Sequence, residues 1–241
     1  MSRVVLVTGS SRGIGFGIAK CFAANGDTVV LNGREDAKTL AESVEELKRT
    51  GYDVASFISD LSNYENAKEM FLQVKARYGP VEVLINNAGS AHYGLFSDMC
   101  VPDIQGVLAN NLHTTINASH LAVPDMVRAK SGCIINITSV WGITGASCEV
   151  MYSASKAAVI GFTKALAKEL GPSGVRVNAI ACGAFDTRMN DQLSHEEKNA
   201  FAENIPLGRF GYPDEAGALA VFMAGAEYLT GQVIPLDGGL V

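Results

Sequence analysis

Two residues with acid–base chemistry, Tyr152 and Lys156, stand four positions apart in a stretch of helical periodicity. Positions i and i+4 of a helix lie on one face, so the phenol and the ammonium are expected to point the same way. A free tyrosine titrates near ~10, and a nearby ammonium stabilises the phenolate and lowers that pKa toward neutral pH. The spacing alone is common by chance and is more typical of a packed tyrosine beside a solvated lysine.

A glycine-rich segment follows the first apolar run and opens a helix: Thr8-Gly9-Ser10-Ser11-Arg12-Gly13-Ile14-Gly15. Gly9 permits a tight turn, Gly13 lets the backbone approach a pyrophosphate, and Gly15 lets the helix pack closely on the strand. The helix N-terminus offers free N–H groups and a positive dipole end to the phosphate. Because the segment lies between a strand and a helix, it predicts a dinucleotide site rather than a structural turn.

The end of the second apolar run indicates which dinucleotide binds. An NAD site usually places a carboxylate there for the ribose 2′-hydroxyl, whereas this run ends Leu31-Asn32-Gly33-Arg34, with Glu35 only afterwards. Arg34 and Arg12 could instead clamp a 2′-phosphate. The alternative is two solvated arginines. NADPH is therefore the expected cofactor, and NAD is the less favoured one.

Short apolar runs alternate with longer helical stretches along the whole chain. The runs are near-continuous, as expected for parallel strands buried on both faces; they span residues 4–7, 28–31, 54–58, 81–85, 133–137, 175–180 and 232–235. The helical stretches span residues 13–25, 35–50, 63–78, 98–130, 151–171 and 213–226. This alternation predicts an α/β fold of the Rossmann type, a doubly wound, seven-stranded parallel sheet with helices on both faces.

No linker or low-complexity tract interrupts the alternation, so residues 1–241 are expected to form a single dinucleotide-binding domain. The segment 186–208 differs: it is polar, helical in period and flanked by glycines. It lies between the sixth and seventh strands, where an open parallel sheet has its ligand crevice. A lid over the substrate is the functional interpretation, and a surface helical insertion is the alternative.

Composition excludes several classes of protein. The 241 residues carry a net charge of −6, which favours neither nucleic acid nor an anionic membrane. The five cysteines and four histidines have no metal-ligand or C-x-x-C spacing, so no metal site is expected and the thiols are taken as reduced. The N-terminus lacks the apolar region of a signal peptide, and no run approaches the ~20 residues of a membrane span. A cytoplasmic protein is expected.

Several motifs in the same order resemble those of the short-chain dehydrogenase/reductase family over essentially the whole chain. They are the glycine segment Thr8–Gly15, Asn86-Asn87-Ala88-Gly89, Asn111, Ser139 and Tyr152-x-x-x-Lys156. The resemblance implies that the Tyr152/Lys156 pair is catalytic rather than structural. It also implies an assembly of identical subunits, a homodimer or a homotetramer, of which the homotetramer is the expected one.

The resemblance implies roles for individual residues. Tyr152 resembles the general acid that protonates the substrate oxygen, and Ser139 the donor that orients it. Lys156 resembles the residue that binds the nicotinamide ribose and tunes Tyr152, and Asn111 the one that holds a water in the proton relay. The expected cofactor-binding set is Gly9, Ser11, Arg12, Gly13, Ile14, Gly15, Arg34, Asp60, Leu61, Asn87, Ala88, Gly89, Tyr152, Lys156, Gly183, Phe185 and Thr187.

Within the family the chain is most similar to the 3-oxoacyl-acyl-carrier-protein reductases, which act in fatty acid biosynthesis. The similarity extends over the segment that runs from residue 205 to residue 239. Departures affect the substrate side: Cys182-Gly183 replaces Pro-Gly, and Ser173 stands where those reductases carry arginine. An acidic carrier protein needs a basic docking patch, of which Arg128 and Lys130 could form half.

The expected substrate-lining residues are His92, Ser139, Trp141, Glu149 and Cys182. Glu149 could bind a polar or hydroxylated substrate or face solvent. Cys182 could be a reactive thiol, although a small residue beside the cofactor is the favoured interpretation.

Three functions remain open from the sequence. The first is NADPH-dependent reduction of a carbonyl to a secondary alcohol, with a 3-oxoacyl thioester as substrate, in some cases linked to an acyl carrier protein. The second is reduction or oxidation of a small ketone, sugar or polyol. The third is a dinucleotide-binding regulator without turnover. A stripe of small residues, Ala154, Ala158, Gly161 and Ala165, permits close helix approach, either between subunits or inside the monomer.

Overall fold

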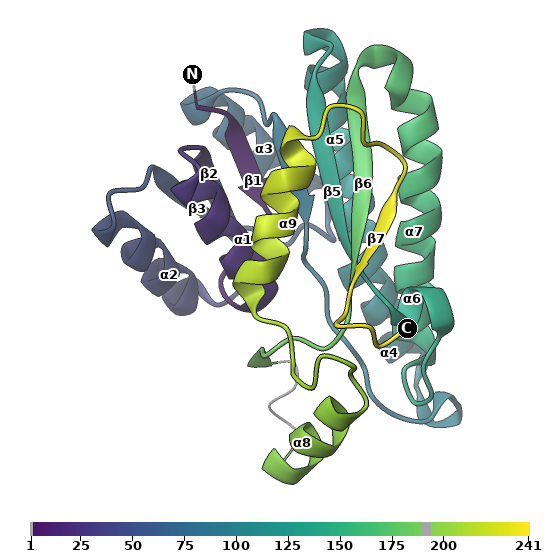
Figure 1. Cartoon of the computed structure of the whole chain (residues 1–241). Helices are drawn as coiled ribbons and strands as arrows, with labels where there is room; N and C mark the ends of the chain where they lie inside the picture. The colour runs from purple at the N-terminus through teal and green to yellow at the C-terminus, as the bar shows by residue number, and fades with distance from the viewer. Residues whose placement is uncertain (1, 189–193) are drawn as a thin grey trace.

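The computed structural model describes residues 2–188 and 194–241. Within these residues, seven parallel strands form one sheet in the order β3-β2-β1-β4-β5-β6-β7 (Figure 1). The strands are β1 (Val4–Val7), β2 (Thr28–Gly33), β3 (Val54–Ile58), β4 (Val83–Asn86), β5 (Gly132–Ser139), β6 (Val175–Cys182) and β7 (Val233–Leu236). The α/β doubly wound fold expected from the alternation of strands and helices is confirmed.

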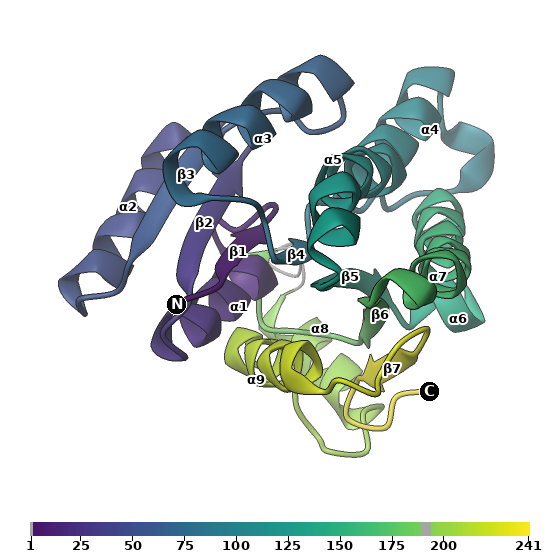
Figure 2. The same ribbon diagram turned by 90° about the horizontal axis from the view of Figure 1, so that it is seen from above.

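The helices connect successive strands and cover both faces of the sheet. They are α1 (Gly13–Ala24), α2 (Ala37–Arg49), α3 (Tyr64–Tyr78), α4 (Val101–Leu108), α5 (Thr114–Ala129), α6 (Trp141–Thr144), α7 (Val150–Leu170), α8 (His195–Glu203) and α9 (Pro213–Gly225). Figure 2 shows α1 and α9 below the sheet and α3, α5 and α7 above it. Each face has its own apolar core, one built with α1, α2 and α9 and the other with α3, α5 and α7.

The central strands are apolar because both of their faces are covered. Every residue of β1, β2 and β4 is buried. β5 and β6 pair over their full length, from Gly132 opposite Val175 to Ser139 opposite Cys182. This long pairing carries two side chains of the expected site, Ser139 and Cys182, to the same carboxyl edge.

The stretch 98–130, expected as one helix, is divided in the structure. α4 ends at Leu108, a π-helical turn follows over Ala109–His113, and α5 begins at Thr114. A π turn inserts one extra residue and widens the helix. Two threonine hydroxyls bond to carbonyls of this turn, Thr114 to Asn110 O at 2.6 Å and Thr115 to Asn111 O at 3.0 Å.

The segment 186–208 contains one helix, α8, which stands beyond the carboxyl ends of the strands (Figure 1). A capping box begins it: the Ser194 hydroxyl accepts from Glu197 N at 3.2 Å, and the Glu197 carboxylate accepts from Ser194 N at 2.8 Å. Residues 189–193 of the expected lid lie outside the described residues. None of the side chains of α8 is buried.

Candidate active site

A cleft of about 410 Å³ lies at the carboxyl edge of the sheet. The strand order reverses between β1 and β4, the place where ligands bind in open parallel sheets. Its wall contains most of the residues expected to bind the cofactor: Gly9, Ser11, Arg12, Gly13, Ile14, Arg34, Asp60, Leu61, Asn87, Ala88, Gly89 and Thr187. Segments that are far apart in the sequence therefore meet where the glycine motif predicts a dinucleotide.

The glycine loop is shaped by contacts that only glycine allows. A Cβ on Gly9, whose φ is +61°, would lie 2.7 Å from Ala88 Cα, and one on Gly15 would lie 2.4 Å from Asn87 Nδ2. Asn87 braces the same loop, because its Nδ2 donates to Thr8 O at 3.0 Å and to Gly9 O at 2.9 Å. The loop between β1 and α1 is thereby held against the end of β4, with the N-terminus of α1 open toward the cleft.

Tyr152, Ser139 and Lys156 come together beside this cleft. Tyr152 and Lys156 lie on one face of α7, and both are buried, with 9% and 5% of their surface exposed. Ser139, at the end of β5, lies near the Tyr152 phenol, and the influence of its hydroxyl lowers the pKa of that phenol. Lys156 Nζ lies 5.7 Å from the centre of the Tyr152 ring and donates to Ile137 O at 3.0 Å. The expected catalytic residues are thus neighbours in space.

Burial changes the acid–base properties of the pair in a direction that the sequence did not indicate. It raises the pKa of Tyr152 above the ordinary tyrosine value, although the Ser139 hydroxyl offsets part of the rise. It also lowers the pKa of Lys156 to about 8. Removal from water is thus the largest effect on the pKa of Tyr152, so the phenol of the free chain does not titrate near neutral pH. The lowering of this pKa by Lys156 stays a prediction.

Asn111 lies in the π turn and is fully buried. Its Nδ2 donates to Ser90 O at 3.0 Å and to Ser155 Oγ at 2.9 Å, while its Oδ1 accepts from Ser90 N at 2.7 Å. The Ser155 hydroxyl in turn donates to Tyr152 O at 2.7 Å. Asn111 therefore ties the segment after β4 to α7, and its part in a water relay stays a prediction.

Comparisons with known proteins agree with this geometry. A family model described as short chain dehydrogenase matches residues 3–198. A 3-oxoacyl-acyl-carrier-protein reductase FabG of Chlamydia muridarum is 38% identical over 244 residues, covering 100% of this chain and 98% of the relative. The corresponding reductase of Aquifex aeolicus is 40% identical, covering 99% of this chain and 97% of the relative.

The chain belongs to the short-chain dehydrogenase/reductase family.

A solved structure supports the same conclusion at the level of the fold. A protein of Agrobacterium tumefaciens, described as a candidate gluconate dehydrogenase, superimposes with a TM-score of 0.95 at 30% identity. The match covers 99% of this chain and 95% of that one. As a member of this oxidoreductase family, the chain uses a nicotinamide dinucleotide, and the glycine cradle described above fits one.

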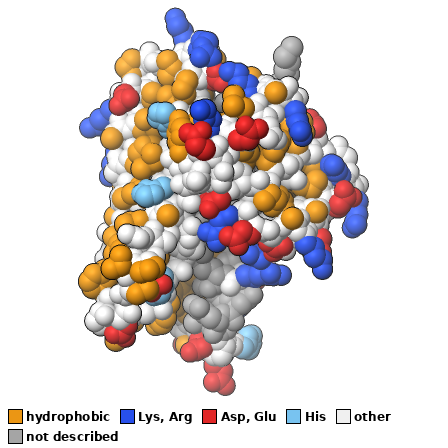
Figure 3. All heavy atoms as spheres, turned by 180° about the vertical axis from the view of Figure 1, so that it is seen from behind, with side chains coloured by type: hydrophobic (Ala, Val, Ile, Leu, Met, Phe, Trp, Pro, Cys, Tyr) orange, Lys and Arg blue, Asp and Glu red, His pale blue; other side chains and the backbone are white. Residues whose placement is uncertain are grey.

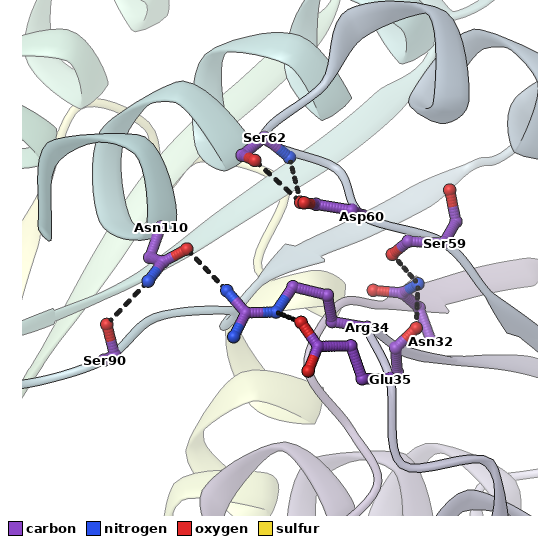
Figure 4. A network of polar contacts seen from close by, with 9 residues as sticks. Asn32, Arg34, Glu35, Ser59, Asp60, Ser62, Ser90 and Asn110 are labelled. Atoms are coloured by element: carbon purple, nitrogen blue, oxygen red, sulfur yellow. Dashed lines mark hydrogen bonds and ion pairs between the residues drawn. The ribbon is translucent and has the colours of Figure 1, made fainter. Parts of the chain in front are cut away.

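In this short-chain dehydrogenase/reductase, charged side chains of both signs line the end of the cleft beyond β2. Arg34 Nε lies 3.0 Å from Glu35 Oε1, and Arg12 Nη1 lies 3.6 Å from Asp36 Oδ2. Figure 4 shows Arg34 reaching from the end of β2 toward the π turn. The two arginines expected to choose the cofactor thus share one cleft, each beside a carboxylate.

The sequence did not single out several residues of this cleft. Asp36 caps α2 by accepting from Thr39 N at 3.0 Å, and hydrogen bonds from Thr39, with the charges of Arg12 and Arg188, lower its pKa. An aspartate at the start of a helical stretch is a typical N-cap, so this role of Asp36 could have been predicted from the sequence. The others, which are Asn32, Gly33, Glu35, Ser59, Ser90, Asn110, Thr114 and Arg188, carry no spacing that marks them.

Five expected cofactor residues lie outside the cleft lining: Gly15, Tyr152, Lys156, Gly183 and Phe185. The last two of these belong to the segment after β6. A Cβ on Gly183 would lie 2.6 Å from Asp237 Cβ, so this glycine allows the C-terminal segment to approach β6. Phe185 is 3% exposed and forms a bridge with Gly211. Both residues therefore support the segment that carries Thr187 to the cleft, and their direct contact with cofactor stays a prediction.

The residues expected on the substrate side differ in accessibility. His92, Trp141 and Glu149 are half-buried, and burial raises the pKa of Glu149. Cys182 is buried, and burial raises the pKa of its thiol to about 12. A thiol with that pKa is protonated at neutral pH, which argues against the reactive-thiol interpretation.

The basic pair proposed for carrier-protein docking lies away from this cleft within one chain. Arg128 and Lys130 are at the end of α5, immediately before β5 begins, and hence at the amino edge of the sheet. Arg128 is also paired with Asp125. Within a single chain, these two residues do not adjoin Tyr152.

Proposed function

We propose that this enzyme reduces a carbonyl to a secondary alcohol with NADPH, and that its substrate is a 3-oxoacyl thioester. The observation that carries the proposal is the buried cluster of Tyr152, Ser139 and Lys156 beside the dinucleotide cleft. A nicotinamide bound there would supply the hydride. The protein supplies a proton donor and its placement.

The protonated state of Tyr152 suits a proton donor. The phenol keeps its proton at neutral pH and can give it to a carbonyl oxygen as negative charge develops there. Its raised pKa makes it a weaker acid in the free chain, so a cation beside it has to favour the phenolate. The Ser139 hydroxyl, which lies near that phenol, can donate to the same oxygen and fix its position. The Lys156 ammonium stabilises the phenolate that remains.

NADPH is proposed over NADH because Arg12 and Arg34 both line the cleft at its β2 end. A guanidinium binds phosphate through charge-assisted hydrogen bonds. The carboxylates of Glu35 and Asp36 lie beside these arginines and offset part of their positive charge. Both arginine side chains remain about half exposed, so a phosphate in the cleft can still reach them.

Apolar surface next to the site supports a substrate with an apolar chain. Tyr93, Leu95, Phe96 and Val101 expose 67%, 60%, 53% and 64% of their surface, and Figure 3 shows hydrophobic side chains gathered at this corner of the molecule. The Gly94 amide donates to Cys148 O at 2.8 Å, which joins this corner to the segment just before α7. Relatives described as 3-oxoacyl-acyl-carrier-protein reductases support the same substrate class.

A small ketone, sugar or polyol is the second candidate because of Glu149. Its carboxyl is half-buried one position before α7, and its raised pKa shows an environment removed from water. Such a group recognises a substrate hydroxyl. The protein of Agrobacterium tumefaciens described as a candidate gluconate dehydrogenase favours this class.

One assay separates the two. We expect oxidation of NADPH with acetoacetyl-CoA, followed by absorbance, and slower turnover with NADH. No turnover with the thioester, together with turnover of a polyol or sugar in the same panel, would contradict the acyl assignment and favour the second candidate.

We also infer a homo-oligomer in the cytoplasm. Ala154, Ala158, Gly161 and Ala165 are all exposed on α7, so the small-residue stripe is not packed inside the monomer. All five cysteines are free, which suits a reducing compartment. Within the described residues, no helix is long and apolar enough to cross a membrane.

A further inference from the structure

A line of hydrogen bonds crosses the β2 end of the cleft. Arg34 Nη1 donates to Asn110 Oδ1 at 2.8 Å, and Asn110 Nδ2 donates to Ser90 Oγ at 3.0 Å (Figure 4). The backbone of Ser90 is itself held at both its N–H and its carbonyl by the buried Asn111. The line therefore begins on a fully buried side chain and ends on a guanidinium that is half exposed to the cleft.

The order of these contacts makes Asn110 a support for Arg34. The amide of Asn110 cannot turn freely, because its nitrogen is bonded to Ser90 and its oxygen then faces the guanidinium. A flexible arginine loses side-chain entropy when it binds an anion, and a partner that already holds it reduces that cost. Asn110 and Ser90 thus prepare the side chain for a ligand.

The guanidinium keeps donors for that ligand. Of its five N–H groups, Nε faces Glu35 and one on Nη1 faces Asn110. In the part of the chain that the structure describes, these contacts leave the second Nη1 hydrogen and both Nη2 hydrogens for a phosphate. Asn110 is neutral, so it orients the cation without cancelling its charge, whereas the Glu35 carboxylate opposes an incoming anion.

We propose that Asn110, held by Ser90, is a positioning residue that presents Arg34 to the 2′-phosphate of the cofactor and so sets the preference for NADPH. This inference rests on the NADPH dependence proposed above. Asn110 affects the choice of cofactor by orienting Arg34, and it does not itself contact the phosphate.

Two nucleotides that represent the adenosine half of the cofactor provide the test. Adenosine 2′,5′-bisphosphate carries the 2′-phosphate and adenosine 5′-monophosphate lacks it, so the ratio of their dissociation constants isolates that phosphate. Titration calorimetry on the full chain measures both. The unaltered protein is expected to bind the bisphosphate more tightly.

Asn110→Ala is expected to weaken the bisphosphate about 3- to 10-fold, a modest loss because the pair is half exposed, and to leave the monophosphate within about twofold. Asn110→Asp should weaken it further, because a carboxylate there would neutralise Arg34. Ser90→Ala should act in the same direction, and Ser90→Thr, which keeps the hydroxyl, should restore the unaltered ratio. In kinetics, Asn110→Ala should raise KM for NADPH with kcat retained.

Asn204→Ala is the matched control, because Asn204 Nδ2 bonds to Ala200 O on the exposed end of α8, away from the cleft lining. Retained binding of the monophosphate shows that each variant is folded. An equal loss for both nucleotides, or no loss in Asn110→Ala, would overturn the role of Asn110 alone. Equal affinity of the unaltered protein for the two nucleotides would overturn the proposed NADPH preference itself, and the role of Asn110 with it.

Discussion

At the scale of single residues, burial and a neighbouring hydroxyl act on Tyr152 in opposite directions. Burial raises its pKa, and the Ser139 hydroxyl lowers it by a smaller amount. Lys156 responds to the same burial with a lowered pKa, because its charged form is the one that water stabilises. The cluster therefore holds a protonated phenol next to an ammonium that titrates close to neutral pH.

Tyr152→Phe removes the proton donor and keeps the ring. Reduction by NADPH should fall about 10²- to 10⁴-fold, the usual contribution of general acid catalysis. Binding of NADPH, measured by calorimetry, should change little. Unchanged turnover in this variant would exclude Tyr152 as the acid, whereas loss of NADPH binding would assign it a structural role.

The lowered pKa of Lys156 predicts how the rate depends on pH. The ammonium is present below a pH of about 8 and is lost as the pH rises through that value. Because kcat/KM reports groups of the free enzyme, kcat/KM for NADPH should fall above pH 8. Lys156→Arg keeps its charge over this range, so its profile should lack the alkaline decline even if its rate is lower. The same decline in both proteins would refute the assignment.

At the scale of elements, the helices α1 and α9 lie side by side in Figures 1 and 2. They pack closely because a glycine of each helix faces the other helix. A Cβ on Gly17 would lie 2.5 Å from the carbonyl carbon of Pro213, and one on Gly217 would lie 2.7 Å from Gly17 O. The glycine-loop end of α1 therefore depends on a helix from the other end of the chain.

Gly17→Ala should force α1 and α9 apart, because the added methyl meets rigid backbone. We expect the free energy of unfolding to fall by about 1–3 kcal/mol, as for overpacked cores, in urea denaturation. Gly106→Ala in α4 is the control, since a Cβ there meets nothing within 4 Å. That variant should be unchanged or more stable by up to about 1 kcal/mol. Equal stability of the two variants would refute the packing argument.

At the scale of the whole molecule, the outer face of α7 has the small residues of a helix-packing surface, and these residues are exposed within the part of the chain that the structure describes. Gly161 is exposed and a Cβ there would meet nothing within 4 Å, and Ala158 beside it is exposed as well. Small side chains permit two helices to approach closely. We therefore expect a second copy of the chain on this face.

Gly161→Glu should leave the fold of one chain intact and disrupt that contact, since a carboxylate would be buried between helices. Light scattering coupled to size exclusion should then show a smaller particle than for the unaltered protein. Ala76→Glu, on the exposed face of α3, should not change the mass. A monomeric unaltered protein, or a Gly161→Glu variant of unchanged mass, would contradict this interface.

Much of the fold could be predicted because its signals are local. Each strand was expected within a few residues of its observed position, since a continuous apolar run records burial on both faces. The π turn at Ala109–His113 was not expected, because no residue type marks it and contacts with Ser90 and Ser155 surround it. The one-turn helix α6 was too short to show a period.

The sequence by itself determined the fold class and the glycine cradle, because these depend on residue types at fixed short spacings, whereas Tyr152 as the proton donor is a prediction from the order of several motifs. Only the tertiary structure decided the direction of the Tyr152 pKa, the partner of Arg34 and the exposure of the α7 stripe. Burial and the contact between Arg34 and Asn110, which are 76 positions apart, arise when distant segments pack together. No spacing along the chain records those distances.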